Sequence, residues 1–135
     1  MDWQGAMLSR LRAASAVTSL VSTKSYWEQA PQGTVRPYVT LLDVTQLRPQ
    51  TLKDWDLEAA RIQIDVWADT YTSKNNIMEA VLNALVPGGT SNGHTFQRGD
   101  IDLGPRDVAG ERDGTNPIFR KTADLIVHHT TEEVT

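Results

Sequence analysis

A strict alternation of apolar and polar residues between Leu57 and Asp69 is the feature that most constrains the fold. Ile62, Ile64 and Val66 occupy every second position of this segment. The positions between them carry polar or amphipathic side chains, namely Arg61, Gln63, Asp65 and Trp67. Because successive side chains of a β-strand point to opposite faces, this pattern predicts a strand with one face on a core and one face toward a wetter environment.

Apolar residues at helical spacing predict two helices. The first spans residues 3–21 and is expected to be kinked or broken near Ser15, since the β-branched and hydroxyl residues that follow have weak helix propensity. The second begins after the hydroxyl-rich segment 70–73, which offers N-cap side chains, and it ends at Pro87 with the two glycines that follow.

Several further segments have β composition. Residues 24–28 form a short aromatic piece, residues 37–45 begin with a proline and continue as a strand, and residues 118–129 form the last strand. Residues 94–97 and 100–103 together suggest one more strand. The polar stretches 46–56 and 104–117 are interpreted as connections, both long for hairpin loops.

This order of elements predicts an α+β fold: a two-layer domain with an antiparallel sheet of about four to five strands and two helices packed on one face. The chain has 135 residues, so we expect one domain over residues 1–135, with residues 130–135 as a mobile polar tail. The expected core residues are apolar and share the inward faces: Ile62, Ile64, Val66, Ile77, Val81, Leu85, Leu125 and Val127.

Composition excludes several classes of function. The chain has no cysteine, which rules out disulfides, thiolate metal sites and cysteine nucleophiles. Its formal net charge of −4 argues against a dedicated nucleic-acid binder, and its basic residues are interleaved with acidic ones. We find neither an apolar run long enough for a membrane helix nor a signal peptide, so no membrane partner is expected.

No catalytic, cofactor or metal signature emerges from the residues. Adjacent His128 and His129 would point to opposite faces of a strand, and we expect these two and His94 to contact water rather than a metal. The glycine-rich stretch 88–93 follows a helix and lacks the lysine of a phosphate-binding loop, so we interpret it as a linker. We therefore expect no enzyme activity, no cofactor and no metal.

Two features exceed what a plain monomer needs. The polar side of the 57–69 strand carries Trp67 among charged residues, joined by residues such as Arg120, Thr122 and Asp124 of the last strand, a composition common at interfaces. Trp67 packing flat under its neighbours is an equally open interpretation. The connections 46–56 and 104–117 either bind a partner or only link strands.

The segment Tyr26–Gly33, followed by Pro37-Tyr38-Val39, resembles the signature of tail completion (tail terminator) proteins of long-tailed bacteriophages. A strand similar to Arg61–Ala68 and a helix soon after a Thr70-Tyr71 pair follow in the same order in that family. The resemblance spans roughly residues 2–130. The stretches 88–93 and 104–117 carry no motif that aligns.

The resemblance implies a non-enzymatic structural role in a phage or prophage virion. Such proteins form a ring, usually a hexamer, on the head-proximal end of the tail tube, stop tube polymerisation and present the head-joining surface. The implied partners are other copies of the chain, the tail-tube protein and a head-completion or connector protein. DNA would pass through without specific binding, and six copies would carry about −24 in total, six times −4. Assembly would take place in the host cytoplasm.

Two alternatives remain open from the residues. Within the same class, the chain could be a head–tail connector or head-completion protein. From another class, it could be a small ligand-binding or hydrolytic α+β domain, which would need a concave pocket with convergent polar groups. For the tail terminator, the candidate subunit or tube contacts are Trp55, Arg61, Trp67, Arg106 and Arg112.

Overall fold

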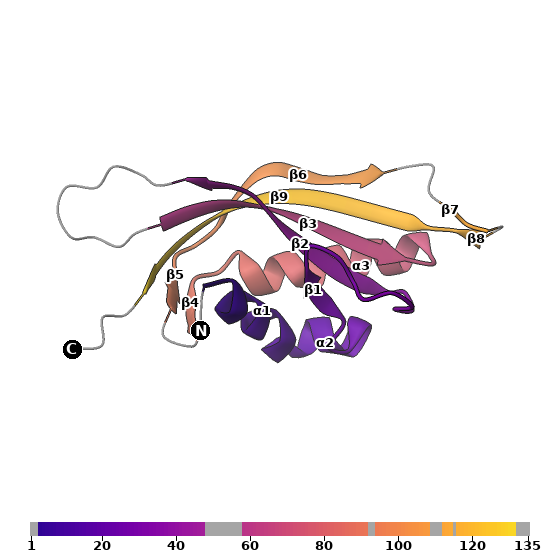
Figure 1. Cartoon of the computed structure of the whole chain (residues 1–135), viewed down its shortest axis with the longest axis horizontal. Helices are drawn as coiled ribbons and strands as arrows, with labels where there is room; N and C mark the ends of the chain where they lie inside the picture. Colours follow the sequence, from indigo (N-terminus) through magenta and orange to yellow (C-terminus); the bar gives the residue numbers. More distant parts are fainter. Residues whose placement is uncertain (1–2, 48–57, 92–93, 109–111, 115, 132–135) are drawn as a thin grey trace.

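The structure of the chain is a computed structural model that describes residues 3–47, 58–91, 94–108, 112–114 and 116–131. Three helices cover one face of a curled sheet, and the opposite face of the sheet carries no helix among these residues (Figure 1). The helices are α1 (Trp3–Ala13), α2 (Ser15–Val21) and α3 (Tyr71–Leu85). The expected α+β class with helices on one face is therefore confirmed.

The main sheet has seven strands, more than the four to five expected. They are β1 (Ser25–Trp27), β2 (Tyr38–Leu47), β3 (Glu58–Ala68), β4 (Gly89–Ser91), β5 (His94–Phe96), β6 (Asp100–Val108) and β9 (Phe119–Thr131). The strand order is β1-β2-β3-β9-β5-β4, and β6 pairs with the first part of β9, ahead of the part that pairs with β5. A separate two-stranded hairpin consists of β7 (Arg112–Asp113) and β8 (Asn116–Pro117).

Most of the expected elements lie where the sequence pattern placed them. The first helix is broken at Ala14, which has an extended backbone (φ −77°, ψ 110°), so α1 and α2 are two helices. The start of α3 is fixed by Thr70, whose hydroxyl accepts a hydrogen bond from the Ser73 backbone N–H at 3.1 Å. β1 departs from the expected antiparallel arrangement because it runs parallel to β2.

Two predicted connections contain strands instead. β6 continues through Val108, so the first part of the expected loop 104–117 belongs to the sheet, and β7 and β8 occupy much of the remainder. Within the expected linker 88–93, residues 89–91 form β4. β9 extends through Thr131, two residues into the expected tail; residues 132–135, and positions 48–56 of the other connection, lie outside the described residues.

The core lies between the sheet and the helices. All eight expected core residues are buried there, and α1 and α2 add Met7, Leu11, Val17 and Val21. The alternation in β3 accounts for this arrangement, because Ile62, Ile64 and Val66 face the helices. The packed helices and central strands thereby fix the position of the uncovered face and of both sheet edges.

Candidate functional site

The uncovered face of the sheet gathers the polar side chains that the alternation placed opposite the core (Figure 1). We call it the open face. It comprises Thr40, Arg61, Gln63, Asp65, Trp67, Asp100, Asp102, Arg106, Arg120, Thr122, Asp124 and His128, contributed by β2, β3, β6 and β9. The expectation that residues of the last strand join Arg61, Gln63, Asp65 and Trp67 on this face is confirmed.

One half of the open face is an ion-paired cluster that links three strands. Arg61 of β3 donates from Nη2 to Asp102 Oδ2 of β6 at 2.6 Å and to Asp124 Oδ2 of β9 at 3.1 Å. Arg106 of β6 reaches the other oxygen of Asp124 at 3.4 Å. Asp124 is only 6% exposed although no described helix covers it, because the two arginine side chains lie over it.

The other half of the open face is built around Asp65 and Trp67. Asp65 accepts from Arg120 at 3.1 Å and from the amide of Gln63 at 2.8 Å. The Arg120 guanidinium also lies 4.5 Å from the centre of the Trp67 ring. Trp67 stacks on Tyr38 and donates from Nε1 to the Thr40 hydroxyl at 3.1 Å. Trp67 is thus held on three sides by the face itself.

The charges of the open face largely balance one another. Its three arginines, Arg61, Arg106 and Arg120, are each ion-paired with Asp65, Asp102 or Asp124. A fourth carboxylate, Asp100, lies 3.8 Å from His128 on the same face. The face is polar and closely paired, with one more carboxylate than arginine, so most of the chain's net charge of −4 resides elsewhere.

The contacts of Trp67 predict a role in stability. Replacing Trp67 by alanine should lower the free energy of unfolding by about 2 kcal/mol, because the ring packs against Tyr38 and Arg120 and its indole N–H is bonded. Trp67→Phe retains the stacking and should cost only about 1 kcal/mol. Urea unfolding curves measure both values. Unchanged stability of Trp67→Ala together with impaired assembly would instead assign Trp67 to an interface.

The structure brings together three of the five candidate contact residues. Arg61, Trp67 and Arg106 lie on the open face, whereas Arg112 is exposed on β7, away from that face. Trp55 lies outside the described residues. Asp102 is a further member of the cluster: the sequence predicts a strand over residues 100–103, but it does not show that this strand lies beside β9 and brings Asp102 to Arg61.

Both long edges of the sheet are exposed. Beyond Leu41, β2 pairs only with β3, and β6 pairs only with β9, among the residues that the structure describes. Large apolar side chains are exposed on each of these edges: Leu42 (41%) and Val44 (46%) on β2, and Ile101 (47%) and Leu103 (45%) on β6. Unpaired backbone together with exposed apolar side chains is typical of a strand that pairs with another chain.

The edge strand β6 is tethered to α3 by a buried lysine. Lys74 is 2% exposed, its Nζ lies 2.5 Å from Asp107 Oδ1 of β6, and it lies 4.1 Å from the centre of the Tyr71 ring. The hydrogen bond from Lys74 holds the pKa of the Asp107 carboxyl below its ordinary value, with added attraction from Lys74 and Lys121. The Asp107 carboxylate therefore stays ionised at neutral pH, and its hydrogen bond with Lys74 links β6 to α3.

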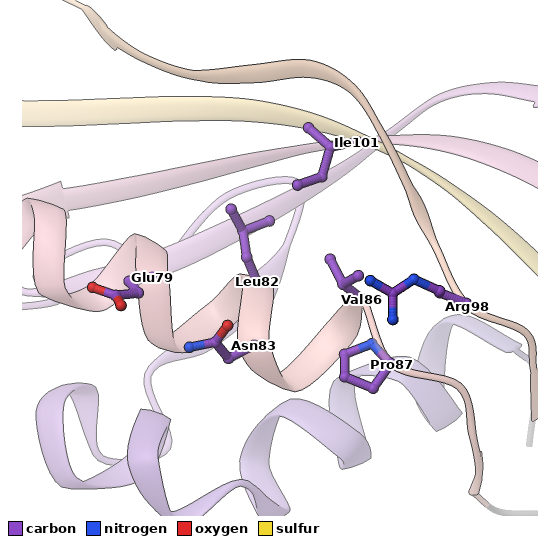
Figure 2. Close-up of a pocket in the computed structure, with 7 residues that line it drawn as sticks. All are labelled: Glu79, Leu82, Asn83, Val86, Pro87, Arg98 and Ile101. Atoms are coloured by element: carbon purple, nitrogen blue, oxygen red, sulfur yellow. The ribbon is translucent and has the colours of Figure 1, made fainter.

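A largely apolar hollow of about 310 Å³ lies between α3 and the start of β6. Figure 2 shows Leu82 and Ile101 pointing toward each other across it, with Glu79 and Arg98 at opposite ends. A second hollow shares Glu79 and Leu82 and continues along α3 toward Pro105. With its two charged groups this far apart, the hollow shown in Figure 2 does not present convergent acid and base groups.

The histidines differ from expectation in their burial. His129 (2% exposed) and His94 (6% exposed) are buried rather than in contact with water, since His129 faces the core, stacks on Trp3 at 4.7 Å and lies near Phe96. His128 lies on the opposite face, 3.8 Å from Asp100, as predicted for adjacent strand residues. Within the described ranges, no three His, Asp or Glu side chains form a group that could hold a metal.

A search for membrane-spanning helices, made over the same residues, finds none that is both long and apolar enough.

Comparison with known proteins identifies a family. The model of the family described as tail completion protein gp17 matches residues 5–116. A solved structure titled as the virion of a native gene transfer agent particle contains a chain of the same fold, with a TM-score of 0.65 and 20% identity over 97% of this chain and 95% of that one. A second solved chain matches with a TM-score of 0.54 and 10% identity over 98% and 94% of the two chains. No curated protein matches.

Proposed function

We propose that this chain, which belongs to the tail completion protein gp17 family, forms a closed ring that caps the head-proximal end of a phage-type tail tube. Membership of the family makes it a structural component of a phage tail. The finer role has three parts: the ring stops tube polymerisation, offers the surface for joining the head, and acts without enzyme chemistry. The ring would assemble in the host cytoplasm and remain in the virion.

The proposal of a ring rests on one observation, the two exposed edges of the sheet. β2 and β6 lie on opposite sides of the four central strands β2-β3-β9-β6, and both expose apolar side chains. Pairing of β2 from one copy with β6 of the next joins two different surfaces, which makes the contact heterologous. Such contacts close into a ring when the rotation between copies returns to its start. Six copies are the number that the resemblance implies.

Two further observations support a role in a virion. The chain of similar fold in the gene transfer agent structure is part of an assembled virion, and the likeness covers nearly the whole of both chains. The hollow between α3 and β6 is largely apolar and lacks convergent acid and base groups. These features favour an assembly protein over a ligand-binding or hydrolytic domain. The tube partner and the head-side partner are further parts of the proposal.

Native mass spectrometry and negative-stain imaging of the purified chain, with and without tail-tube protein, test this function. We expect closed rings, or tubes capped at one end. A chain that stays monomeric at high concentration and never binds tube ends would overturn the proposal. Rings that ignore the tube but bind a head-side connector would instead assign the chain to the connector class.

A further inference from the structure

We propose that the open face lines the channel of this ring, and that its carboxylates neutralise its arginines so that duplex DNA slides past without being held. This inference rests on the proposed function, because it requires the ring. It extends the proposed function by stating which face of the sheet points toward the channel. It also gives a reason why three arginines on the channel wall would not bind the phosphates of the DNA.

Closure through the two edges limits where the helices can lie. Six copies of the four strands β2, β3, β9 and β6 would make a closed sheet of about 24 strands, with a circumference of ~115 Å and a radius of ~18 Å at the usual strand spacing. A strand tilt of ~45° would widen this radius to ~26 Å, and helices packed ~10 Å inside the sheet would then have room for about ten side by side. Six copies of α1, α2 and α3 bring 18 helices, six times three. The helices must therefore lie outside, and the open face inside.

The charge pattern of the open face then determines how strongly the channel wall binds DNA. Free arginines on a channel wall bind phosphates, release counterions and raise DNA affinity with each contact. Here Arg61 is held between Asp102 and Asp124, at 2.6 and 3.1 Å, and Arg120 is held by Asp65 at 3.1 Å. Each guanidinium already has a carboxylate of its own chain at contact distance. A passing phosphate would have to displace that carboxylate to bind.

The burial of the carboxylates strengthens this pairing. Asp65 and Asp124 are 5% and 6% exposed, so at these two positions the surface presents the side chains of the arginines paired with them, which are 22–44% exposed. Replacing Asp by Asn removes the carboxylate charge and keeps the size of the side chain. The same arginines would then face the DNA, but without a carboxylate to neutralise them. The wall would then change from a slight excess of carboxylates to an excess of arginines, and the effect on DNA binding can be measured directly.

The first test measures DNA binding of Asp65→Asn with Asp124→Asn, using fluorescence anisotropy of a labelled duplex at low salt. We expect at least tenfold tighter binding than the wild-type chain shows, with a steeper dependence on salt. The matched control is Glu28→Gln with Glu79→Gln, which removes two negative charges at exposed positions outside the open face. Equal gains in both variants, or no gain in either, would overturn the neutralisation.

A milder variant covers the case in which the double variant does not fold. Asp102 is 35% exposed at its side chain and pairs with Arg61, so Asp102→Asn leaves Asp124 in place. We expect a smaller but measurable gain in DNA affinity, with Glu79→Gln alone as its control. Circular dichroism establishes that each variant retains its fold before binding is measured. An affinity for Asp102→Asn that equals that of the control would contradict the proposal.

The second test concerns the direction of the open face and uses the absence of cysteine in the chain. Gln63→Cys places a thiol on the open face, and Glu79→Cys places one on exposed α3. In capped tubes, a small maleimide should label both, whereas a bulky polyethylene-glycol maleimide should label only Glu79→Cys. Equal labelling by the bulky reagent would overturn the inward orientation. Failure to assemble any ring is scored before labelling, and it would count against the proposed function itself.

Discussion

Two variants that each block one edge of the sheet should be monomeric alone and should form a one-to-one heterodimer when mixed. The β2 variant carries Leu42→Lys and Val44→Lys, and the β6 variant carries Ile101→Lys and Leu103→Lys. A lysine on an edge strand disfavours pairing with another chain, because its charge would be buried in the contact. In the mixture, the intact β6 of one variant can still pair with the intact β2 of the other. Both remaining edges are blocked, so growth stops at two copies.

Native mass spectrometry of the separate and mixed variants measures this outcome, under conditions in which the wild-type chain forms rings. The four substituted side chains are 41–47% exposed, so folding should change little, by less than about 1 kcal/mol for each substitution. The matched control is Leu20→Lys with Val35→Lys, which replaces exposed apolar residues away from both edges and should still form rings. If either edge variant alone forms dimers, the contact joins like edges, and the heterologous arrangement is wrong.

Replacing Arg10 by alanine should lower the free energy of unfolding by about 3 kcal/mol. From α1, Arg10 donates to the carbonyl oxygens of Pro87 at 2.6 Å and Ala84 at 3.3 Å, and its guanidinium lies 5.0 Å from the centre of the Phe96 ring. It thereby ties the first helix to the end of α3 and to β5. Burial lowers the pKa of Arg10 below its ordinary value, but an arginine still carries its charge at neutral pH.

A second arginine on the same helix provides the control for this prediction. Arg12 is exposed and donates to the carbonyl oxygen of Ser25 at 2.8 Å, so Arg12→Ala should cost no more than about 1 kcal/mol. Arg10→Met keeps the packing volume and should recover part of the loss. Urea unfolding of the three variants gives the values. Equal losses for Arg10→Ala and Arg12→Ala would mean that the contacts of Arg10 at the end of α3 add no more to the free energy of unfolding than the single hydrogen bond of Arg12.

The sequence predicts best where burial produces a clear period. In β3, the alternation of Ile62, Ile64 and Val66 with polar residues is enough by itself to identify the strand, its core face and most of the open face. The spacing along α3 and its cap at Thr70 are equally informative. Each of these segments has one buried side and one exposed side, so apolar and polar residues recur in it at a regular spacing.

The sequence predicts least where neither side of a segment is buried. Eight of the nine residues of β6 are exposed, and beyond Leu103 the strand has no apolar period, so its residue pattern indicates a loop over its second half. Its position depends on backbone pairing with β9 and on the contact between Lys74 and Asp107, which lie far apart in the chain. The burial of His129 depends likewise on a contact with Trp3, which local pattern does not reveal. The interface roles of the five candidate contact residues stay predictions: Trp55, Arg61, Trp67, Arg106 and Arg112.

Both edge strands carry irregularities in their register, one between Asp43 and Thr45 in β2 and two between Ile101 and Arg106 in β6. A straight edge accepts any partner strand at any offset, whereas a bulged edge twists away and interrupts its own row of hydrogen-bonding groups. The edge strand of a second copy would therefore have to align its own bulge with the bulge of the first copy. Free copies should therefore find the matching offset slowly, and a template such as a finished tube end would speed the choice of that offset. The bulges would in this way set the rate of assembly, which should be fastest where there is a tube to close.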